Sequence, residues 1–192
     1  MHTKEKNCCF TGYRPEKFDF KFDDTDEKFN IFTKRLLTAI SKAISNGCTT
    51  FYTGMACGFD IMAAEHIALM KCINKDLRLI AVIPFKEQSK GFSYEWKRRY
   101  DALLKNCDET VVLNDAYEKW VFAQRNRYMV DRSQFCITYY DGKPGGTKNT
   151  LQYAQKHGVE ILNVYNTDPL GDVTGKYTAY FKLIAPDSYI ND

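Results

Sequence analysis

The sequence predicts an α/β fold: a Rossmann-like, doubly wound and mainly parallel sheet of about six strands with helices on both faces. Three observations predict it. Short apolar runs alternate with segments of helical period along the 192 residues, as in successive βαβ units. Hydrophobic residues make up 44% of the chain, which is enough for one buried core. Glycine-bearing turns follow three of the runs, where a strand would hand over to a helix.

The first strand and the first helix are predicted at 7–11 and 26–45. The run 7–11 is short and apolar. In the second segment Phe29, Phe32 and Leu36 recur at steps of three and four, which is the period of a helix with one buried face. This stripe is therefore assigned to the core.

The next elements follow the same alternation. The run 49–53 is rich in β-forming residues, and helical spacing follows over 61–68. The run 77–83 is almost continuously apolar, which is typical of a strand that is buried on both faces. Helical period returns over 93–106.

The remaining elements complete the alternation. We predict a strand at 109–113, a helix at about 117–133, a strand at 135–140, a helix at 147–157 and a strand at 159–165. Parallel strands joined in this way place all their carboxyl ends at one edge of the sheet.

We expect one domain over residues 1–165. The tail 166–192 mixes glycine, proline and aromatic residues, and it is predicted to pack on the domain or on a partner subunit. The aperiodic stretch 18–26 is predicted to be a loop that covers the site. Aromatic-rich segments at 18–22 and 177–181 are candidates for covering a partner subunit, so a homo-oligomer is expected.

The composition argues against several classes of protein. A net charge of +3 gives no reason to expect a long nucleic-acid track. Seven cysteines without a C-x-x-C pair indicate buried free thiols in a reducing compartment. The N-terminus has no apolar leader, and no run of 18 apolar residues occurs, so we expect a cytoplasmic protein without a membrane partner. His66 has no second histidine nearby, so we expect no metal site. We expect no cofactor either.

The first glycine turn follows the run 7–11. Gly12 lets the backbone approach a ligand, and Arg14 is suited to binding a phosphate or a carboxylate through its guanidinium. The alternative is a surface arginine beside a proline turn.

The second turn joins the run 49–53 to a helix. Gly54, Met55 and Gly58 suggest backbone donors around an anion, although the spacing does not match G-x-G-x-x-G. Asp60 is a candidate ligand residue or, equally, a helix cap. Glu65 lies one turn further and faces either the site or solvent.

The third turn follows the run 135–140. Gly145, Gly146 and Thr147 leave backbone N–H groups facing the gap, which is a place for a phosphate. A tight turn without a ligand is the alternative. On the preceding helix Arg125 and Asn126 are candidate ligand contacts, but the favoured interpretation of Arg125 from sequence alone is an ion-paired surface residue. In a doubly wound sheet all three turns fall on the ligand-binding edge.

Four segments together resemble a known family. They are 9–15 (CFTGYRP), 53–60 (TGMACGFD), 125–131 (RNRYMVD) and 140–150 (YDGKPGGTKNT). In this order they look like the YpsA-like branch of the SLOG superfamily, which also contains the lonely-guy (LOG) phosphoribohydrolases and the DNA-processing protein DprA. The resemblance runs from about residue 7 to 165.

The resemblance implies a Rossmann-like fold whose glycine turns hold a nucleotide or a nucleotide-derived ligand. Arg125 falls on the arginine that precedes the last ligand loop of LOG enzymes. Gly145, Gly146 and Thr147 look like a shortened form of the P-G-G-x-G-T-x-x-E loop. Thr150 stands where that loop has its catalytic glutamate, and a threonine cannot replace a carboxylate in glycosidic cleavage.

Three functions therefore remain. The first is non-catalytic binding of a nucleotide or an ADP-ribose-like molecule by a sensor or sequestering protein. The alternative is a nucleotide N-ribosyl hydrolase in which Arg125 holds phosphate and Glu65 or Asp60 supplies the carboxylate. The third, which the sequence does not favour, is single-stranded DNA binding of the DprA kind.

Overall fold

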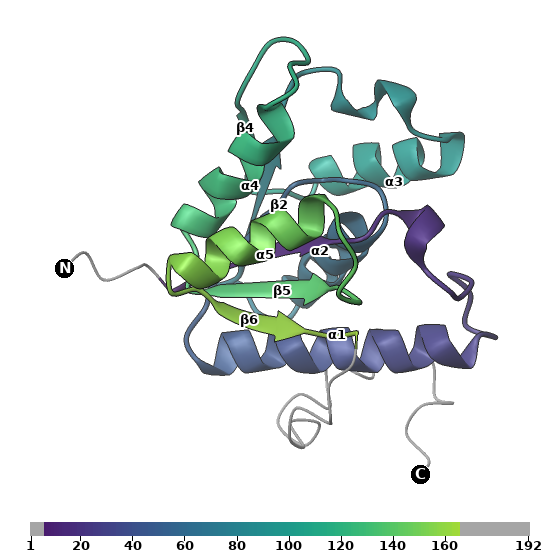
Figure 1. Cartoon of the computed structure of the whole chain (residues 1–192). Helices are drawn as coiled ribbons and strands as arrows, with labels where there is room; N and C mark the ends of the chain where they lie inside the picture. The colour runs from purple at the N-terminus through teal and green to yellow at the C-terminus, as the bar shows by residue number, and fades with distance from the viewer. Residues whose placement is uncertain (1–5, 166–192) are drawn as a thin grey trace.

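The computed structural model describes residues 6–165, in which six parallel strands form one sheet of order β4-β3-β2-β1-β5-β6 (Figure 1). The strands are β1 (Asn7–Gly12), β2 (Thr50–Thr53), β3 (Arg78–Ile83), β4 (Glu109–Val112), β5 (Phe135–Tyr139) and β6 (Glu160–Asn163). The order reverses between β1 and β5, which pair from Cys8 with Phe135 to Gly12 with Tyr139. The predicted fold class is confirmed. The predictions for the tail 166–192 lie outside the described residues.

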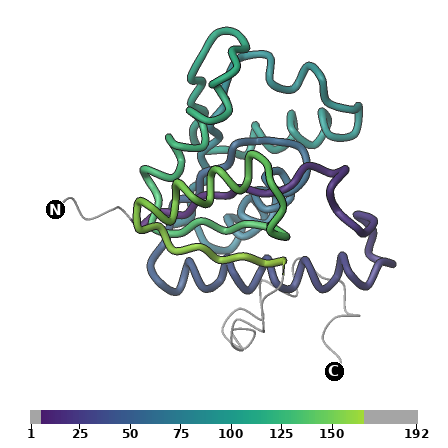
Figure 2. The backbone as a smooth tube through the Cα atoms, in the orientation of Figure 1, coloured from purple at the N-terminus to yellow at the C-terminus, as the bar shows by residue number. Residues whose placement is uncertain are grey.

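Five α-helices connect the strands. They are α1 (Glu27–Ser45), α2 (Phe59–Met70), α3 (Tyr94–Leu104), α4 (Val121–Asp131) and α5 (Gly146–Lys156), with short 3₁₀ helices η1 (Pro15–Lys17) and η2 (Gln88–Gly91). The backbone tube in Figure 2 follows the repeated passage from strand to helix and back to strand. Within the described residues no helix is both long enough and apolar enough to cross a membrane.

The sheet has a hydrophobic core on each face. One core joins the sheet to α1, α2 and α3, and the other joins it to α4 and α5. Neighbouring residues of β1 divide between them, since Cys8 belongs to the first core and Cys9 to the second. This alternation is what a strand covered on both faces requires. Five of the seven cysteines are buried as free thiols.

The start of α4 differs from the prediction. The helix was expected from about residue 117 but begins at Val121. Tyr117 instead lies against the rings of Phe85 and Phe122, at centroid distances of 5.6 and 6.1 Å. These tertiary ring contacts hold the preceding segment as a turn, which helical periodicity alone does not reveal.

The aromatic segment 18–22 also differs from the prediction, because it packs on its own domain. Phe18 stacks on Tyr139 at 4.7 Å, and Phe20 lies 5.4 Å from Phe32 of α1. Phe22 contacts Trp96 of α3. These side chains seal the margin of the core that contains α1, so they are not a surface reserved for a second subunit.

Candidate functional site

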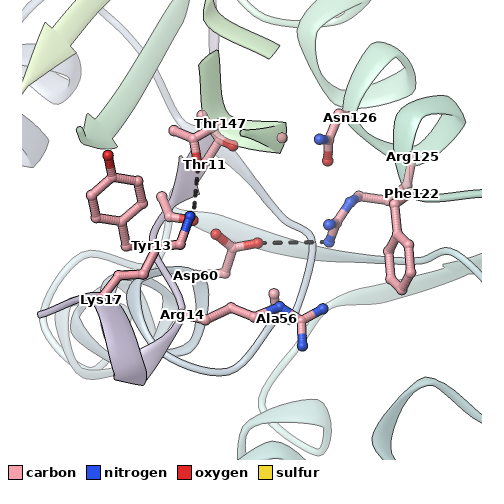
Figure 3. A pocket seen from close by; sticks show the side chains of 12 residues that line it. Thr11, Tyr13, Arg14, Lys17, Ala56, Asp60, Phe122, Arg125, Asn126 and Thr147 are labelled. Carbon is pink, nitrogen blue, oxygen red and sulfur yellow. Dashed lines mark hydrogen bonds and ion pairs between the residues drawn. The ribbon is translucent and has the colours of Figure 1, made fainter. Parts of the chain in front are cut away.

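A pocket of about 270 Å³ opens where the strand order reverses, beyond the carboxyl ends of β1 and β5. Ligands of doubly wound sheets bind at this position. The side chains drawn in Figure 3 come from the β1 turn, the start of α2, the first turns of α4 and the first turn of α5. The lining residues are Thr11, Gly12, Tyr13, Arg14, Lys17, Ala56, Asp60, Phe122, Arg125, Asn126, Gly146 and Thr147.

Two exposed cations stand at the pocket. Arg14 lies over the ring of Phe122 at 6.0 Å, and the Lys17 ammonium lies over the ring of Tyr13 at 5.1 Å. Within residues 6–165 neither cation forms an ion pair with a carboxylate. The Arg14 charge acts on Asp60 through space without a contact, and both cations remain accessible to a ligand that enters the pocket.

The third cation, Arg125, is buried and already paired. Only 6% of it is exposed, its guanidinium lies 3.6 Å from the Asp60 carboxylate, and it donates a hydrogen bond to the Gly54 carbonyl. Figure 3 shows the pair on the floor of the pocket. The prediction that Arg125 is ion-paired is correct, but the prediction that it lies on the surface is wrong. Arg125 is buried against Asp60 and Gly54, which come from the distant β2–α2 segment.

Burial sets the protonation behaviour of this pair. Desolvation raises the pKa of Asp60 to about 6, against the opposing effects of the Arg125 charge, the Ala56 N–H group, the Arg14 charge and the Gly12 N–H group. Desolvation likewise lowers the pKa of Arg125, which stays a cation at neutral pH. Asp60 is therefore a carboxylate that changes charge in mildly acidic solution.

The Gly54–Gly58 turn is closed by the protein itself. The Gln88 amide donates to the carbonyls of Gly54 and Met55, at 2.9 and 3.0 Å. Gly58 has a φ of +89°, and a Cβ placed there would meet the Tyr13 carbonyl oxygen at 2.5 Å. At Gly54 a Cβ would collide with the Arg125 guanidinium. Gly54 and Gly58 therefore serve close packing, and two carbonyls of the turn are occupied by Gln88 and Arg125. The role of the turn's N–H groups as donors to an anion stays a prediction.

The Gly145–Thr147 turn is open. Gly145 and Gly146 are exposed, and no side chain caps the first turn of α5. The N–H groups of Gly146 and Thr147 have no backbone acceptor within the described part of the chain. The Thr147 hydroxyl donates to the Gly12 carbonyl at 3.3 Å, which holds the turn against β1. The N-terminus of α5 thus offers free N–H donors and the positive end of the helix dipole.

A second link holds the β1 and β5 turns together. The Tyr13 hydroxyl donates to the Asp141 carboxylate, and Lys143 pairs with the same carboxylate at 2.7 Å. The hydrogen bond from Lys143 and then that from Tyr13 lower the pKa of Asp141 to about 2. The wall of the pocket is therefore fixed between its two strands.

Seven of the twelve predicted site residues lie together at the pocket. They are Gly12, Arg14, Asp60, Arg125, Asn126, Gly146 and Thr147. Gly54, Met55, Gly58 and Gly145 lie in the adjoining turns without lining it.

Glu65 is the clear misplacement among the predicted residues. Its carboxylate takes two hydrogen bonds from Arg99 of α3, at 2.9 and 2.5 Å, so it is occupied in helix packing outside the pocket lining.

Five lining residues were not predicted: Thr11, Tyr13, Lys17, Ala56 and Phe122. Phe122 precedes Arg125 and Asn126 by three and four positions, so helical spacing places it on their face of α4. Lys17 reaches the pocket only because η1 turns the chain directly after Arg14. The sequence therefore contained a signal for Phe122 but none for Lys17.

The fold and the pocket together define the class. A parallel sheet with glycine turns at the β1 and β5 ends, and an arginine-bearing helix before the second, is the arrangement of a SLOG-type Rossmann-like domain. The chain belongs to the family whose model, YpsA, is described as the YspA SLOG family and matches residues 8–168.

Relatives with similar sequences come from Bacillus subtilis. The uncharacterized SPbeta prophage-derived protein YoqJ is 31% identical over 135 residues, which cover 64% of this chain and 79% of YoqJ. The UPF0398 protein YpsA is 27% identical over 154 residues, which cover 79% of this chain and 85% of that protein.

Solved structures with a similar fold are DNA processing proteins A (DprA). The Streptococcus pneumoniae protein has a TM-score of 0.52 and 19% identity, over 81% of this chain and 48% of its own. The Helicobacter pylori protein, whose single-stranded DNA binding mode is described, has a TM-score of 0.50 and 18% identity, over 81% of this chain and 63% of its own. The chain therefore corresponds to about half to two thirds of these proteins, and the likeness concerns the fold.

Proposed function

We propose that this protein binds a nucleotide or an ADP-ribose-like small molecule in the cytoplasm, as a sensor or a sequestering protein and without catalysis. The observation that carries the proposal is the pocket at the strand-order reversal. There the uncapped start of α5 faces two exposed cations, Arg14 and Lys17.

The phosphate is assigned to the α5 side of the pocket. The N–H groups of Gly146 and Thr147 donate to its oxygens, and the helix dipole favours negative charge there. Arg14 and Lys17 supply the balancing positive charge. The buried Arg125–Asp60 pair is close to neutral overall and contributes shape more than charge.

A base or another planar group is assigned to the α4 side. Phe122 lines the pocket and is supported by the ring of Phe85 at 6.0 Å. Beside it Trp120 and Tyr117 are 52% and 57% exposed. Aromatic surface next to a phosphate site suits a nucleotide better than a bare phosphate, because every base has a face that can stack.

The proposal of binding without catalysis rests on Thr150. This residue is 5% exposed and its hydroxyl is engaged in hydrogen bonds within the domain. It stands at the position of the LOG glutamate, so that carboxylate is missing from the pocket. Asp60 is the one carboxylate among the lining residues, and it is held by Arg125.

Native mass spectrometry of the purified protein, before and after denaturation, tests the proposal. A co-purifying nucleotide is the expected result, and thermal shift with a panel of nucleotides is the second measurement. A ligand at 100 times its Kd adds about 2.7 kcal/mol to the free energy of unfolding, which is readily detected. Absence of both a bound mass and a thermal shift would reject the proposal.

A matched pair of variants localises the effect. Lys17→Met removes a cation at the pocket, whereas Lys156→Met removes one from the last turn of α5. The first is expected to weaken nucleotide binding about fivefold, in line with a charged hydrogen bond at a partly exposed site, and the second to leave it unchanged. Equal effects would mean that the ligand does not sit in this pocket.

A nucleotide N-ribosyl hydrolase is the second candidate, and Asp60 is the observation in its favour. A buried carboxylate with a pKa of about 6 inside a pocket is a typical feature of acid–base sites. Chromatography of nucleoside monophosphates incubated with the protein would show free base. Base release that persists in Asp60→Asn would refute this assignment, and no release by the wild type would reject the activity.

Single-stranded DNA binding is the third candidate, and its support is the similarity in fold to the Helicobacter pylori DprA. Fluorescence anisotropy with a labelled oligothymidine separates it from the first proposal. A Kd in the micromolar range that weakens steeply with salt would favour DNA as the ligand.

We also propose that the protein forms a homo-oligomer. The exposed Val112 on the edge strand β4 is consistent with this. Light scattering coupled to size exclusion decides it, and a monomer at all concentrations would contradict it.

A further inference from the structure

A hydrogen-bond chain joins α4 to the first turn of α5 beside the pocket. Asn126 Nδ2 donates to Thr150 Oγ1 at 2.7 Å, and Thr150 Oγ1 donates to the Gly146 carbonyl at 3.0 Å. Thr150 is buried, while Asn126 lines the pocket. The residue at the position of the missing glutamate is therefore connected to the site through Asn126.

The hydrogen bonds of Thr150 fix the orientation of the Asn126 amide. The Thr150 hydroxyl has one proton, and the Gly146 carbonyl takes it. The hydroxyl oxygen can then only accept, so the amide must present Nδ2 to it. Asn126 Oδ1 is left as an acceptor for the pocket, and Figure 3 shows this oxygen on the side of Asn126 that faces Arg125.

Asn126 Oδ1 can bind only a ligand group that donates a hydrogen bond. A phosphate at neutral pH carries acceptors rather than donors, so it is not held by Asn126 Oδ1 and stays with Arg14, Lys17 and the α5 N-terminus. A sugar hydroxyl has a proton to donate. The pocket thus has a place for the phosphate and a separate place for a hydroxyl.

We propose that Asn126 recognises a ribosyl hydroxyl of the phosphorylated ligand, and that Thr150 is the positioning residue that keeps Oδ1 turned toward it. This inference rests on the proposed nucleotide binding. Thr150 replaces a carboxylate here because a neutral hydroxyl can accept from the Asn126 amide and donate to the Gly146 carbonyl at the same time.

Titration calorimetry with paired ligands tests the proposal. The four ribonucleoside monophosphates are compared with their 2′,3′-dideoxy counterparts, which keep base and phosphate but lack both hydroxyls. For the wild type the dideoxy form is expected to bind about five- to tenfold more weakly, the cost of one lost hydrogen bond with an unpaired acceptor left behind. Equal Kd values for each pair would overturn the inference while leaving nucleotide binding intact.

The variants use the ratio of the two Kd values as the readout. Asn126→Leu removes the acceptor at similar volume, so the ratio is expected to fall to about one. Thr150→Val frees the amide to turn and is expected to lower the ratio, whereas Thr150→Ser keeps the hydroxyl and restores it. A general loss of site shape would weaken both ligands equally and leave the ratio unchanged, which would contradict a positioning role.

The failures of the two proposals are distinguishable. If none of the four ribonucleotides binds the folded wild type, the proposed function is rejected and this inference with it. Urea unfolding of each variant shows whether it is folded. If Asn126→Leu does not fold, Asn126→Asp provides the second test: it keeps an acceptor, and a ratio of one in that folded variant would overturn the inference.

Discussion

The two turns that follow β2 and β5 both contain a pair of glycines, but one turn is filled by the protein and the other is exposed. The turn Gly54–Gly58 is filled from within, by the Arg125 guanidinium, the Gln88 amide and the Tyr13 carbonyl. The turn at Gly145 and Gly146 is exposed and has no side-chain cap. Glycines at strand ends therefore serve either packing or ligand approach, and the residues across the edge decide which.

The largest expected effect on stability comes from removing the Arg125 guanidinium that fills the Gly54–Gly58 turn. Arg125→Met leaves Asp60 buried without its ion pair and the Gly54 carbonyl without one of its donors. We expect a loss of about 3–5 kcal/mol in the free energy of unfolding at pH 7. Urea unfolding measures it, with Arg127→Met on the exposed side of α4 as the control, expected within about 0.5 kcal/mol of wild type. Equal midpoints for the two variants would mean that the pair is not structural.

The next effect is a pH dependence from Asp60. Its pKa in the folded protein, about 6, lies above its ordinary value of 3.8, so the native state binds the proton more tightly than the unfolded state. Stability contributed by this group is present below about pH 4 and is lost as pH rises through 6, by roughly 3 kcal/mol in total.

His66 acts against Asp60 in the same window. Burial lowers the pKa of His66 to about 4, so its unfolded state binds more protons and stability rises with pH up to about 6.5. The difference between wild type and Asp60→Asn isolates the carboxylate. We expect the advantage of the wild type over this variant to shrink from pH 4 to pH 6.5, and a constant difference would contradict the raised pKa.

A smaller effect compares the two turns directly. Gly58→Ala places a methyl group against the Tyr13 carbonyl at a φ of +89°, and we expect a loss of about 1–3 kcal/mol. At Gly146 nothing lies within 4 Å of the added carbon, and φ is not in the left-handed region. Gly146→Ala is therefore expected to stay within about 0.5 kcal/mol of wild type. Chemical denaturation of both variants measures the contrast, and a Gly146→Ala loss as large as that of Gly58→Ala would remove the distinction.

Much of the fold was readable from local sequence. Apolar runs located all six strands. The inner strands β3, β2, β1 and β5 are largely buried and need a continuous apolar stretch, whereas the edge strands β4 and β6 are more exposed and were located by short β-forming runs. The start of α4 was missed because the ring contacts of Tyr117, in the segment before the helix, involve Phe85, which lies elsewhere in the chain.

The site was only partly readable, for the same physical reason. The glycine turns and Arg14 can be identified from residue type alone, and the sheet topology brings the turns to one edge. The burial of Arg125 depends on Asp60 and Gly54, and the position of Glu65 depends on Arg99. Partners that meet only in the tertiary structure leave no local pattern, so the sequence could not separate the closed turn from the open one.

The most direct test of ligand binding at the open turn is a backbone amide NMR titration of the protein with a nucleoside monophosphate. We expect the amides of Gly146 and Thr147 to shift and saturate together, while those of Gly54 and Gly58 stay near their free positions, because Gly146 lies in the exposed first turn of α5 whereas Gly54 and Gly58 are buried. Shifts at Gly54 and Gly58 without shifts at Gly146 and Thr147, or no shifts at either turn, would contradict the assignment of the open turn as the ligand site.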